Sequence, residues 1–126
     1  MFLVACAAPP PEVACPDGAA PHAVTPVQGG RAVWCERKNG ARFGPFVEYR
    51  PDGSRWKEGY FIGTRKEGTF LWYHPNGQVM ERSVWKMNQR DGERVLYNDA
   101  GAVTRREVWA AGERTSSEPP DAPLDP

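Results

Sequence analysis

The sequence predicts an all-β fold, a single-layer antiparallel meander of tandem β-hairpins with disordered termini. One phrase occurs three times, as GPFVEYRPDGSRW, GTFLWYHPNGQVM and GERVLYNDAGAVT. Three columns are invariant across the copies and advance by 24 residues: Gly44, Gly68 and Gly92, then Tyr49, Tyr73 and Tyr97, then Gly53, Gly77 and Gly101. A fixed period of this size indicates a repeat array, in which one small unit stacks on itself.

Each copy contains two runs of strand-forming residues around a turn. Aromatic and β-branched residues dominate the first run, as in Phe46-Val47-Glu48-Tyr49, and such residues suit a pleated, half-buried surface. The turn that follows closes on the last glycine column, which supplies the positive φ that a turn needs there. We assign the first glycine column, at the start of each copy, to turns as well. We therefore expect strands near 46–50 and 54–62, near 70–74 and 78–86, and a third hairpin from about 94.

Two sets of aromatic side chains follow the period. Side chains two residues apart share a face of a strand, so the tyrosine column lies on the face of Val47, Leu71 and Val95, and we predict that this face is the packed one. A second column consists of Phe61, Trp85 and Trp109. We interpret both columns as repeat-core packing residues; the alternative is a platform on which a ligand stacks.

The combined pattern, G-x-[aromatic or aliphatic]-x-x-Y-x-[P/D]-[D/N/A]-G with an aromatic residue between copies, resembles the bacterial variant of the MORN repeat. The resemblance covers roughly residues 34–114. It implies a ladder of β-hairpins in one long twisted meander. It also implies a binding role, because related arrays serve as protein-binding and membrane-associated modules, and some bacterial members are labelled antitoxin components.

Composition divides the chain into three parts. Residues 1–30 are rich in proline, alanine and glycine and predict a leader followed by a semi-rigid tether. Residues 31–114 form the predicted repeat array. Residues 115–126 contain four prolines and no aromatic residue, which predicts a disordered tail.

The segment Leu3-Val4-Ala5-Cys6 fits the lipobox of bacterial lipoproteins, in which the cysteine is acylated. A complete export signal would also need a basic segment and a longer apolar segment before it. The alternative is a short apolar leader with an incidental cysteine. On the first reading Cys6 is a lipidation site, and the protein belongs to the cell envelope as an outer-membrane lipoprotein or a periplasmic or secreted protein.

The remaining cysteines, Cys15 and Cys35, make an even pair if Cys6 is acylated, and in an exported protein an even pair predicts a disulfide. The alternative is two free thiols. A metal site is not expected, because two thiols with the distant His22 and His74 do not make a four-ligand set.

Charge separates the array from its flanks. All 16 lysines and arginines but only 11 of the 16 acids lie between Arg31 and Arg114, so the array carries +5 and the flanks −5. A basic sheet could meet an acidic partner or anionic lipid; the alternative is an ordinary solvated face. The excess is too small to favour nucleic-acid binding.

No catalytic, phosphate-binding or nucleophile motif occurs in the sequence, so we expect no enzyme activity, no cofactor and no small-molecule substrate. Two function classes remain. The first is a non-enzymatic protein-interaction module of the envelope, lipid-anchored through Cys6, with an unknown protein partner. The second is an immunity or antitoxin-like protein that neutralises a toxin.

Overall fold

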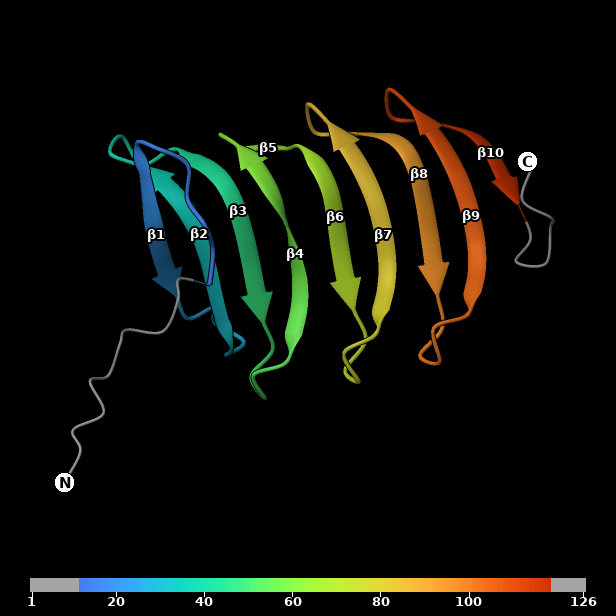
Figure 1. Cartoon of the computed structure of the whole chain (residues 1–126), viewed down its shortest axis with the longest axis horizontal. Helices are drawn as coiled ribbons and strands as arrows, with labels where there is room; N and C mark the ends of the chain where they lie inside the picture. The colour runs from blue at the N-terminus through green and yellow to red at the C-terminus, as the bar shows by residue number, and fades with distance from the viewer. Residues whose placement is uncertain (1–11, 119–126) are drawn as a thin grey trace.

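The computed structural model describes residues 12–118, which form one open antiparallel sheet with every described element a strand (Figure 1). The strands are β1 (Ala19–Val24), β2 (Arg31–Arg37), β3 (Arg42–Tyr49), β4 (Arg55–Ile62), β5 (Arg65–Lys66), β6 (Gly68–Tyr73), β7 (Val79–Lys86), β8 (Gln89–Tyr97), β9 (Val103–Ala110) and β10 (Glu113–Glu118). The main strands pair in sequence order, and the short β5 pairs only with β4. The predicted hairpin meander is confirmed.

The turns explain the third invariant column. The amides of Gly53, Gly77 and Gly101 each donate to the carbonyl three residues earlier at 2.9–3.0 Å, and their φ angles are 89°, 90° and 91°. A residue with a Cβ atom is disfavoured at such angles. The glycine is therefore required by the turn, as predicted.

The first glycine column, which was also predicted to hold turn residues, lies instead within β3, β6 and β8. Gly44, Gly68 and Gly92 have φ angles of 122°, 82° and 125°, which disfavour a residue with a Cβ atom. They lie opposite the second aromatic column across each hairpin. Gly44 pairs with Phe61, Gly68 with Trp85, and Gly92 with Trp109. The two columns are therefore halves of one recurring cross-strand pair.

A β-bulge recurs at the same point of every repeat. The register shifts between Glu48 and Tyr49, between Trp72 and Tyr73, and between Leu96 and Tyr97. A bulge bends its strand and increases the local twist. Three bulges in step give the strands the common bowed shape seen in Figure 1.

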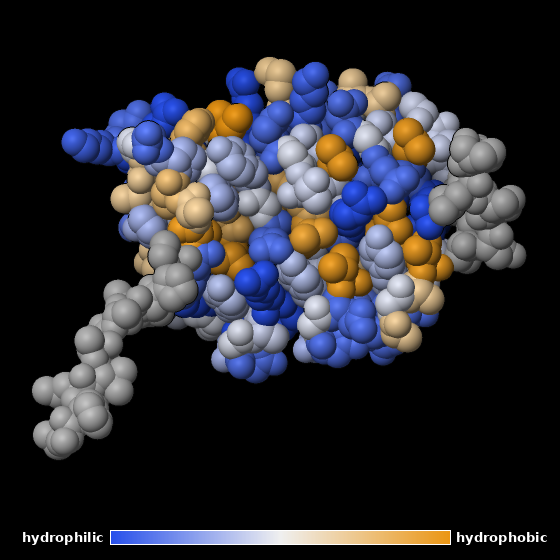
Figure 2. Space-filling view, in the orientation of Figure 1, coloured by the Kyte–Doolittle hydropathy of each residue, from blue (hydrophilic) through white to orange (hydrophobic). Residues whose placement is uncertain are grey.

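Both faces of the sheet are packed, which corrects the expectation of one packed face. The tyrosine face carries Val47 and Val95, which are 3% and 1% exposed, beside half-buried tyrosines. Phe46 and Phe70 lie on the opposite face and are also buried, at 7% and 1%. We call that opposite face the aromatic face, because it also carries Phe61, Trp72, Trp85 and Trp109. In the view of Figure 2, hydrophobic and hydrophilic residues are interspersed over the surface.

The sheet extends beyond the predicted array at both ends. β1 lies inside the predicted tether and pairs along its whole length with β2. β10 runs into the predicted tail and pairs with β9. The tether was predicted from its content of proline, alanine and glycine. β1 contains one proline, Pro21, which an edge strand tolerates because only one side of its backbone is bonded. Residues 1–11 of the predicted leader and 119–126 of the predicted tail lie outside the described residues.

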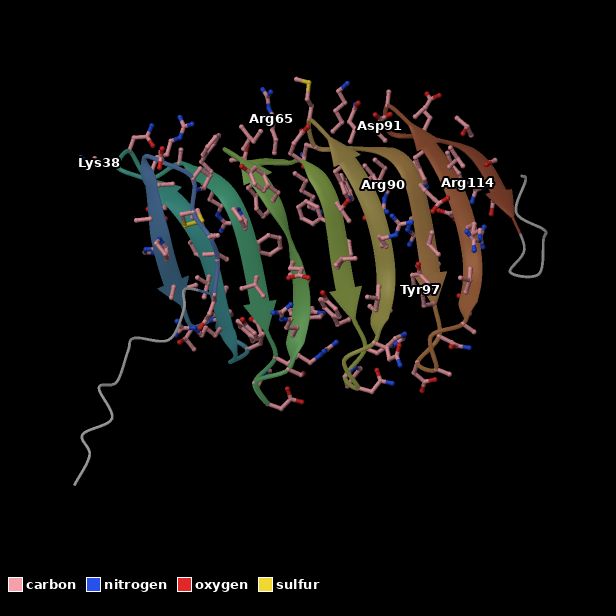
Figure 3. All side chains as sticks on the ribbon, viewed as in Figure 1. Lys38, Arg65, Arg90, Asp91, Tyr97 and Arg114 are labelled. Atoms are coloured by element: carbon pink, nitrogen blue, oxygen red, sulfur yellow. A yellow bond between two sulfur atoms is a disulfide. The ribbon has the colours of Figure 1, made fainter. Side chains whose placement is uncertain are left out.

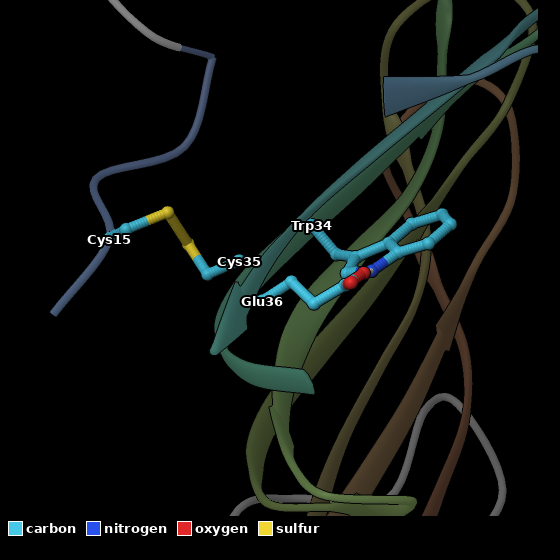
Figure 4. Close-up of a disulfide and its surroundings, with 4 residues drawn as sticks. All are labelled: Cys15, Trp34, Cys35 and Glu36. Carbon is cyan, nitrogen blue, oxygen red and sulfur yellow. Dashed lines mark hydrogen bonds between the residues drawn. A yellow bond between two sulfur atoms is a disulfide. The ribbon is translucent and has the colours of Figure 1, made fainter. Parts of the chain in front are cut away.

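The disulfide between Cys15 and Cys35 is confirmed, with sulfurs 2.06 Å apart and Cα atoms 5.4 Å apart. It ties residues 12–18 onto the tyrosine face, where Val13 packs with Val33 and Val47. Figure 4 shows that the adjacent Trp34 and Cys35 point to opposite faces of β2. The leader therefore covers one face near β2 and leaves the aromatic face to Trp34. Cys6 lies outside the described residues.

Candidate functional site

A column of cations runs along the aromatic face in step with the repeats. Its members are Arg42, Lys66, Arg90 and Arg114, spaced by 24 residues. Arg90 and Arg114 lie at the same level of the sheet in Figure 3. We call this column and the aromatic rings beneath it the cation–aromatic stripe.

Each of the first three cations lies over rings of the aromatic face. The Arg42 guanidinium lies 4.1 Å from the centre of the Trp34 ring and 5.3 Å from that of Phe61. The Lys66 ammonium lies 4.3 Å from the Trp85 ring centre. The Arg90 guanidinium lies 4.8 Å from Trp85 and 5.6 Å from the Trp109 ring. These distances are within the range of cation–π attraction.

The floor of the stripe is a cluster of rings contributed by β3, β4, β6 and β7. The Phe46 ring centre lies 4.9 Å from Phe61 and 5.7 Å from Phe70, and Phe70 lies 6.1 Å from Trp85. Edge and tilted contacts at these distances are favourable for aromatic rings. The cluster holds the cation-bearing strands on a rigid base.

One cross-strand pair changes its chemistry from the first repeat to the last. The pair is Phe46 with Gly59 in the first repeat and Phe70 with Ser83 in the second. In the third repeat it is Arg94 with Glu107. The aromatic face therefore changes along the sheet from rings to ion pairs.

Glu107 is the centre of the ionic end. Its side chain is 4% exposed, and it accepts hydrogen bonds from Arg94 at 2.9 Å and from the Trp109 indole at 3.0 Å. It also forms an ion pair with Arg105 at 2.8 Å. Arg94 reaches Glu81 at 2.8 Å with its other terminal nitrogen. Burial acts to raise the pKa of Glu107, but the bonds from Arg94 and Trp109 and the arginine charges outweigh it, so the pKa is lowered below 4.5. Such bonding favours the charged carboxylate.

A pH dependence of stability follows from Glu107. Because its pKa is lower in the folded chain, its contribution is complete above the unfolded pKa and is lost as pH falls through the folded pKa. Replacing Glu107 by Gln should cost about 2 kcal/mol near pH 7, as expected for hydrogen bonds to a charged group. The urea midpoint, measured at about pH 7 and about pH 3, should fall less with acid in this variant than in wild type.

Glu93→Gln is the matched control, because the Glu93 side chain is 44% exposed and pairs only with Arg82. Removing such a surface pair should cost less than about 1 kcal/mol. An equal acid sensitivity of wild type and Glu107→Gln would contradict the assignment.

Lys66 is the member of the cation column with the least favourable environment. Burial lowers its pKa, and the charges of Arg90 and Lys57 lower it further. Within residues 12–118 neither Lys66 nor Arg42 has a carboxylate within ion-pair distance, whereas Arg90 reaches Glu81 at 3.4 Å and Arg114 reaches Glu107 at 3.8 Å. The C-terminal cations of the stripe are therefore ion-paired, whereas Arg42 and Lys66 are not. Glu36 lies across the strand pair from Arg42, and the charge of Glu81 acts to raise the pKa of Lys66, so their charge is compensated only at longer range. We call the end with Arg42 and Lys66 the positive end of the stripe.

Hydrogen bonds join successive repeats at the tyrosine column. The Tyr73 hydroxyl donates to Glu58 on the neighbouring hairpin. The Arg50 guanidinium donates to the Tyr73 carbonyl, and one repeat later the His74 ring bonds the Tyr97 carbonyl at 2.9 Å. These bonds join successive repeats at the same place, which fits the interpretation of Tyr49, Tyr73 and Tyr97 as core residues.

The cation column escaped the sequence analysis, although the same step of 24 residues would have revealed it. Arg42 precedes the first full copy, so an alignment that begins at Gly44 omits it. The column also contains one lysine, Lys66, among three arginines, so it is not invariant in residue type. Positive charge is invariant in this column, whereas the residue type is not.

Comparison with known proteins finds no family model that matches the chain and no curated protein that matches it. Among residues 12–118 there is no helix of the length and apolar character needed to cross a membrane. The same part of the chain holds no group of three or more histidine, cysteine or acidic side chains placed to bind a metal ion.

Proposed function

We propose that the chain is a non-enzymatic interaction module of the cell envelope, held to a membrane by a lipid on Cys6, which binds a protein partner through its aromatic face. The cation–aromatic stripe is the observation that carries this proposal. Arginine and aromatic side chains dominate the centres of protein interfaces, where a few of them supply most of the binding energy. A stripe of such residues on a hydrogen-bonded sheet is preorganised for a partner.

The two faces differ in a way that supports this choice. Near β2 the tyrosine face is covered by residues 12–18 through the disulfide and the packing of Val13. At the same strands the aromatic face presents Trp34 and Arg42, which are half-buried. The resemblance of the repeats to the bacterial variant of the MORN repeat supports the same class of function.

The lipid anchor rests on the segment before Cys6 and is tested by fractionation. Acyl chains contribute about 0.8 kcal/mol per buried CH₂, and stable attachment requires more than one chain. Expressed with its native upstream sequence, the wild type should sediment with membranes and dissolve in detergent. Cys6→Ser should move to the soluble fraction. A soluble, cytoplasmic wild type would contradict the anchor and leave the binding face to be tested separately.

The binding face is tested by photo-crosslinking in the native cell. A benzophenone amino acid replaces Trp72 on the aromatic face in one variant and Val108 in a matched control. Val108 is 45% exposed and lies on the tyrosine face, opposite Glu93. The Trp72 position should give one discrete adduct, which Lys66→Glu should abolish because it reverses the charge of the stripe. Adducts from Val108 alone, or equally from both positions, would contradict the proposal.

The identity of the crosslinked protein separates the two function classes. An envelope protein as the partner supports the interaction module. A partner that is toxic alone and silenced by co-expression of this chain would replace that proposal with the immunity or antitoxin-like function.

A further inference from the structure

The aromatic face contains a pocket at its positive end, over β2, β3, β4 and β6. It encloses about 150 Å³ and is walled by Trp34, Phe46, Phe61, Phe70 and Trp72. An apolar cavity of this volume accommodates benzene. The size and the aromatic walls together suit a flat apolar group of about that size.

The charge of the pocket is unbalanced. Arg42, Lys57 and Lys66 line it together with one carboxylate, Glu48, so three positive charges face one negative charge. Lys57 and Glu48 lie 3.7 Å apart and neutralise each other in part. Arg42 and Lys66 remain without a carboxylate partner among residues 12–118. The pocket therefore presents a net charge of +2 beside apolar walls, obtained as 3 − 1 from these residues.

In the third repeat a carboxylate of the chain itself pairs with the cations of this face. There Glu107 lies among arginines and accepts a hydrogen bond from the Trp109 indole, so the chain itself supplies the anion. The equivalent position is Gly59 in the first repeat, and it has no side chain to supply one. On β2 the carboxylate of Glu36 lies across from Arg42, but it accepts from the Trp34 indole at 2.9 Å and is not within ion-pair distance of Arg42. Within the described part of the chain, the first two repeats thus lack an ion pair like those that Glu107 makes in the last repeat.

We propose that this pocket binds a carboxylate carried on a flat apolar group of about benzene size. The apolar group contacts the aromatic walls, and the carboxylate accepts hydrogen bonds from Arg42 and Lys66. The Arg42 guanidinium lies over the Trp34 ring, 4.1 Å from its centre, and a guanidinium can donate two hydrogen bonds to one carboxylate. Burial lowers the pKa of Lys66 and the charges of Arg90 and Lys57 lower it further, and an anion placed here would offset that repulsion.

A monoanion fits this pocket better than a dianion. The cost of removing an ion from water rises with the square of its charge, and the apolar walls return little of that cost for a second charge. A phosphate dianion of the same size should therefore bind more weakly than a carboxylate. The ligand is either a free aromatic acid or an acidic side chain beside an aromatic ring in a partner protein.

The first experiment maps binding on the full chain labelled with ¹⁵N. Benzoate is the probe, with benzyl alcohol as the neutral control and phenyl phosphate as the dianion. Benzoate should bind with a dissociation constant on the order of 1 mM, as expected for so small a ligand. The indole N–H signals of Trp34 and Trp72 should shift, while that of Trp109, beyond the pocket, should not. Because this measurement uses the wild type, it does not depend on the folding of any variant.

The second experiment removes the cations one at a time. Arg42→Gln and Lys66→Met should each weaken benzoate binding about tenfold, the value of a lost charge-assisted hydrogen bond. Arg114→Gln is the matched control, because Arg114 belongs to the same column but already faces Glu107. It should change the dissociation constant less than about twofold.

A blocked peptide with one glutamate beside one phenylalanine distinguishes the two sources of the ligand. Tighter binding of the peptide than of benzoate supports a partner's side chain, and the reverse order supports a free acid. Equal binding of benzyl alcohol and benzoate, shifts confined to other signals, or equal affinity of Arg42→Gln, Lys66→Met and wild type would each overturn the proposal. The proposal does not require a protein partner, so failure of the crosslinking experiment leaves it standing.

Discussion

Replacing Phe70 by Ala should destabilise the chain by about 4 kcal/mol, within the range measured for truncating a buried aromatic residue. Phe70 is 1% exposed and contacts rings on three other strands, among them Phe46, Phe61 and Trp85. In a single-layer sheet no second layer can close over the space that the ring leaves. Urea unfolding of wild type and variant measures the difference.

The contact of Phe70 with Gly59 allows a sharper test. A Cβ atom on Gly59 would lie 2.6 Å from the Phe70 ring, and Gly59 is outside the positive-φ region, so Gly59→Ala acts by steric overlap alone. Overpacking of this kind costs about 1–3 kcal/mol. In the Phe70→Ala background the same substitution should cost much less, because the ring is absent.

This double-mutant cycle isolates the coupling between ring and glycine. Phe43→Ala is the positional control, because Phe43 is half-buried near the start of β3 and its truncation should cost less. If Phe70→Ala and Phe43→Ala cost the same, or if the effects of the two substitutions in the cycle simply add, the ring cluster is not the core of this face.

The strands and turns could be predicted because the same pattern of strand-forming and turn-forming residues recurs in each repeat. Tyr73 and Gly77 are recognised as structural residues because the same residue types occur one period before and one period after them. A bulge or turn found in one copy recurs in the others. Local turn chemistry and the period both point to the same hairpins. The disulfide could also be predicted, since two cysteines remain after Cys6 is set aside and both belong to the segment that reaches the first strands.

The aromatic face could not be predicted from the same columns. The column reads Phe46, Phe70 and Arg94 in the three copies, so it appears variable in the sequence. The two phenylalanines pack in a cluster of rings, whereas Arg94 is held by ion pairs with Glu81 and Glu107. Burial on that face comes from residues on neighbouring strands, such as Gly59 beneath Phe70. Such residues are separated in the sequence, so their contact could not be predicted from it. β1 was missed for a related reason, because its stability lies in the pairing with β2 and not in the propensity of its own residues.

Reducing the disulfide between Cys15 and Cys35 should cost about 3 kcal/mol, the chain-entropy value for a closed loop of this length. The cysteines are separated by 20 residues. Cys35 is fully buried in the cluster that also contains Val13, Val33 and Val47. Residues 12–18 have no strand of their own, so the bridge is the covalent link that keeps Val13 in this cluster.

The loss should extend to the first repeat, because the leader also lies against Gly44. A Cβ atom on Gly44 would be 2.7 Å from the Pro16 ring, so the two segments are in close contact. When the bridge opens, the amides of β2 and β3 should exchange with deuterium faster than those of β8 and β9, because local opening follows the contacts that are lost. Mass spectrometry of peptides from each hairpin measures this difference.

The unfolding measurement uses Cys6→Ser throughout, so that the only titrating thiols are those of the bridge. Urea midpoints are compared with and without reductant, and Cys15→Ser/Cys35→Ser serves as the control that cannot form the bond. Reductant should lower the midpoint of the bridged chain to that of the control and leave the control unchanged. If reductant leaves the urea midpoint of the bridged chain unchanged, or lowers the midpoint of the control by the same amount, the bridge does not stabilise the first hairpin.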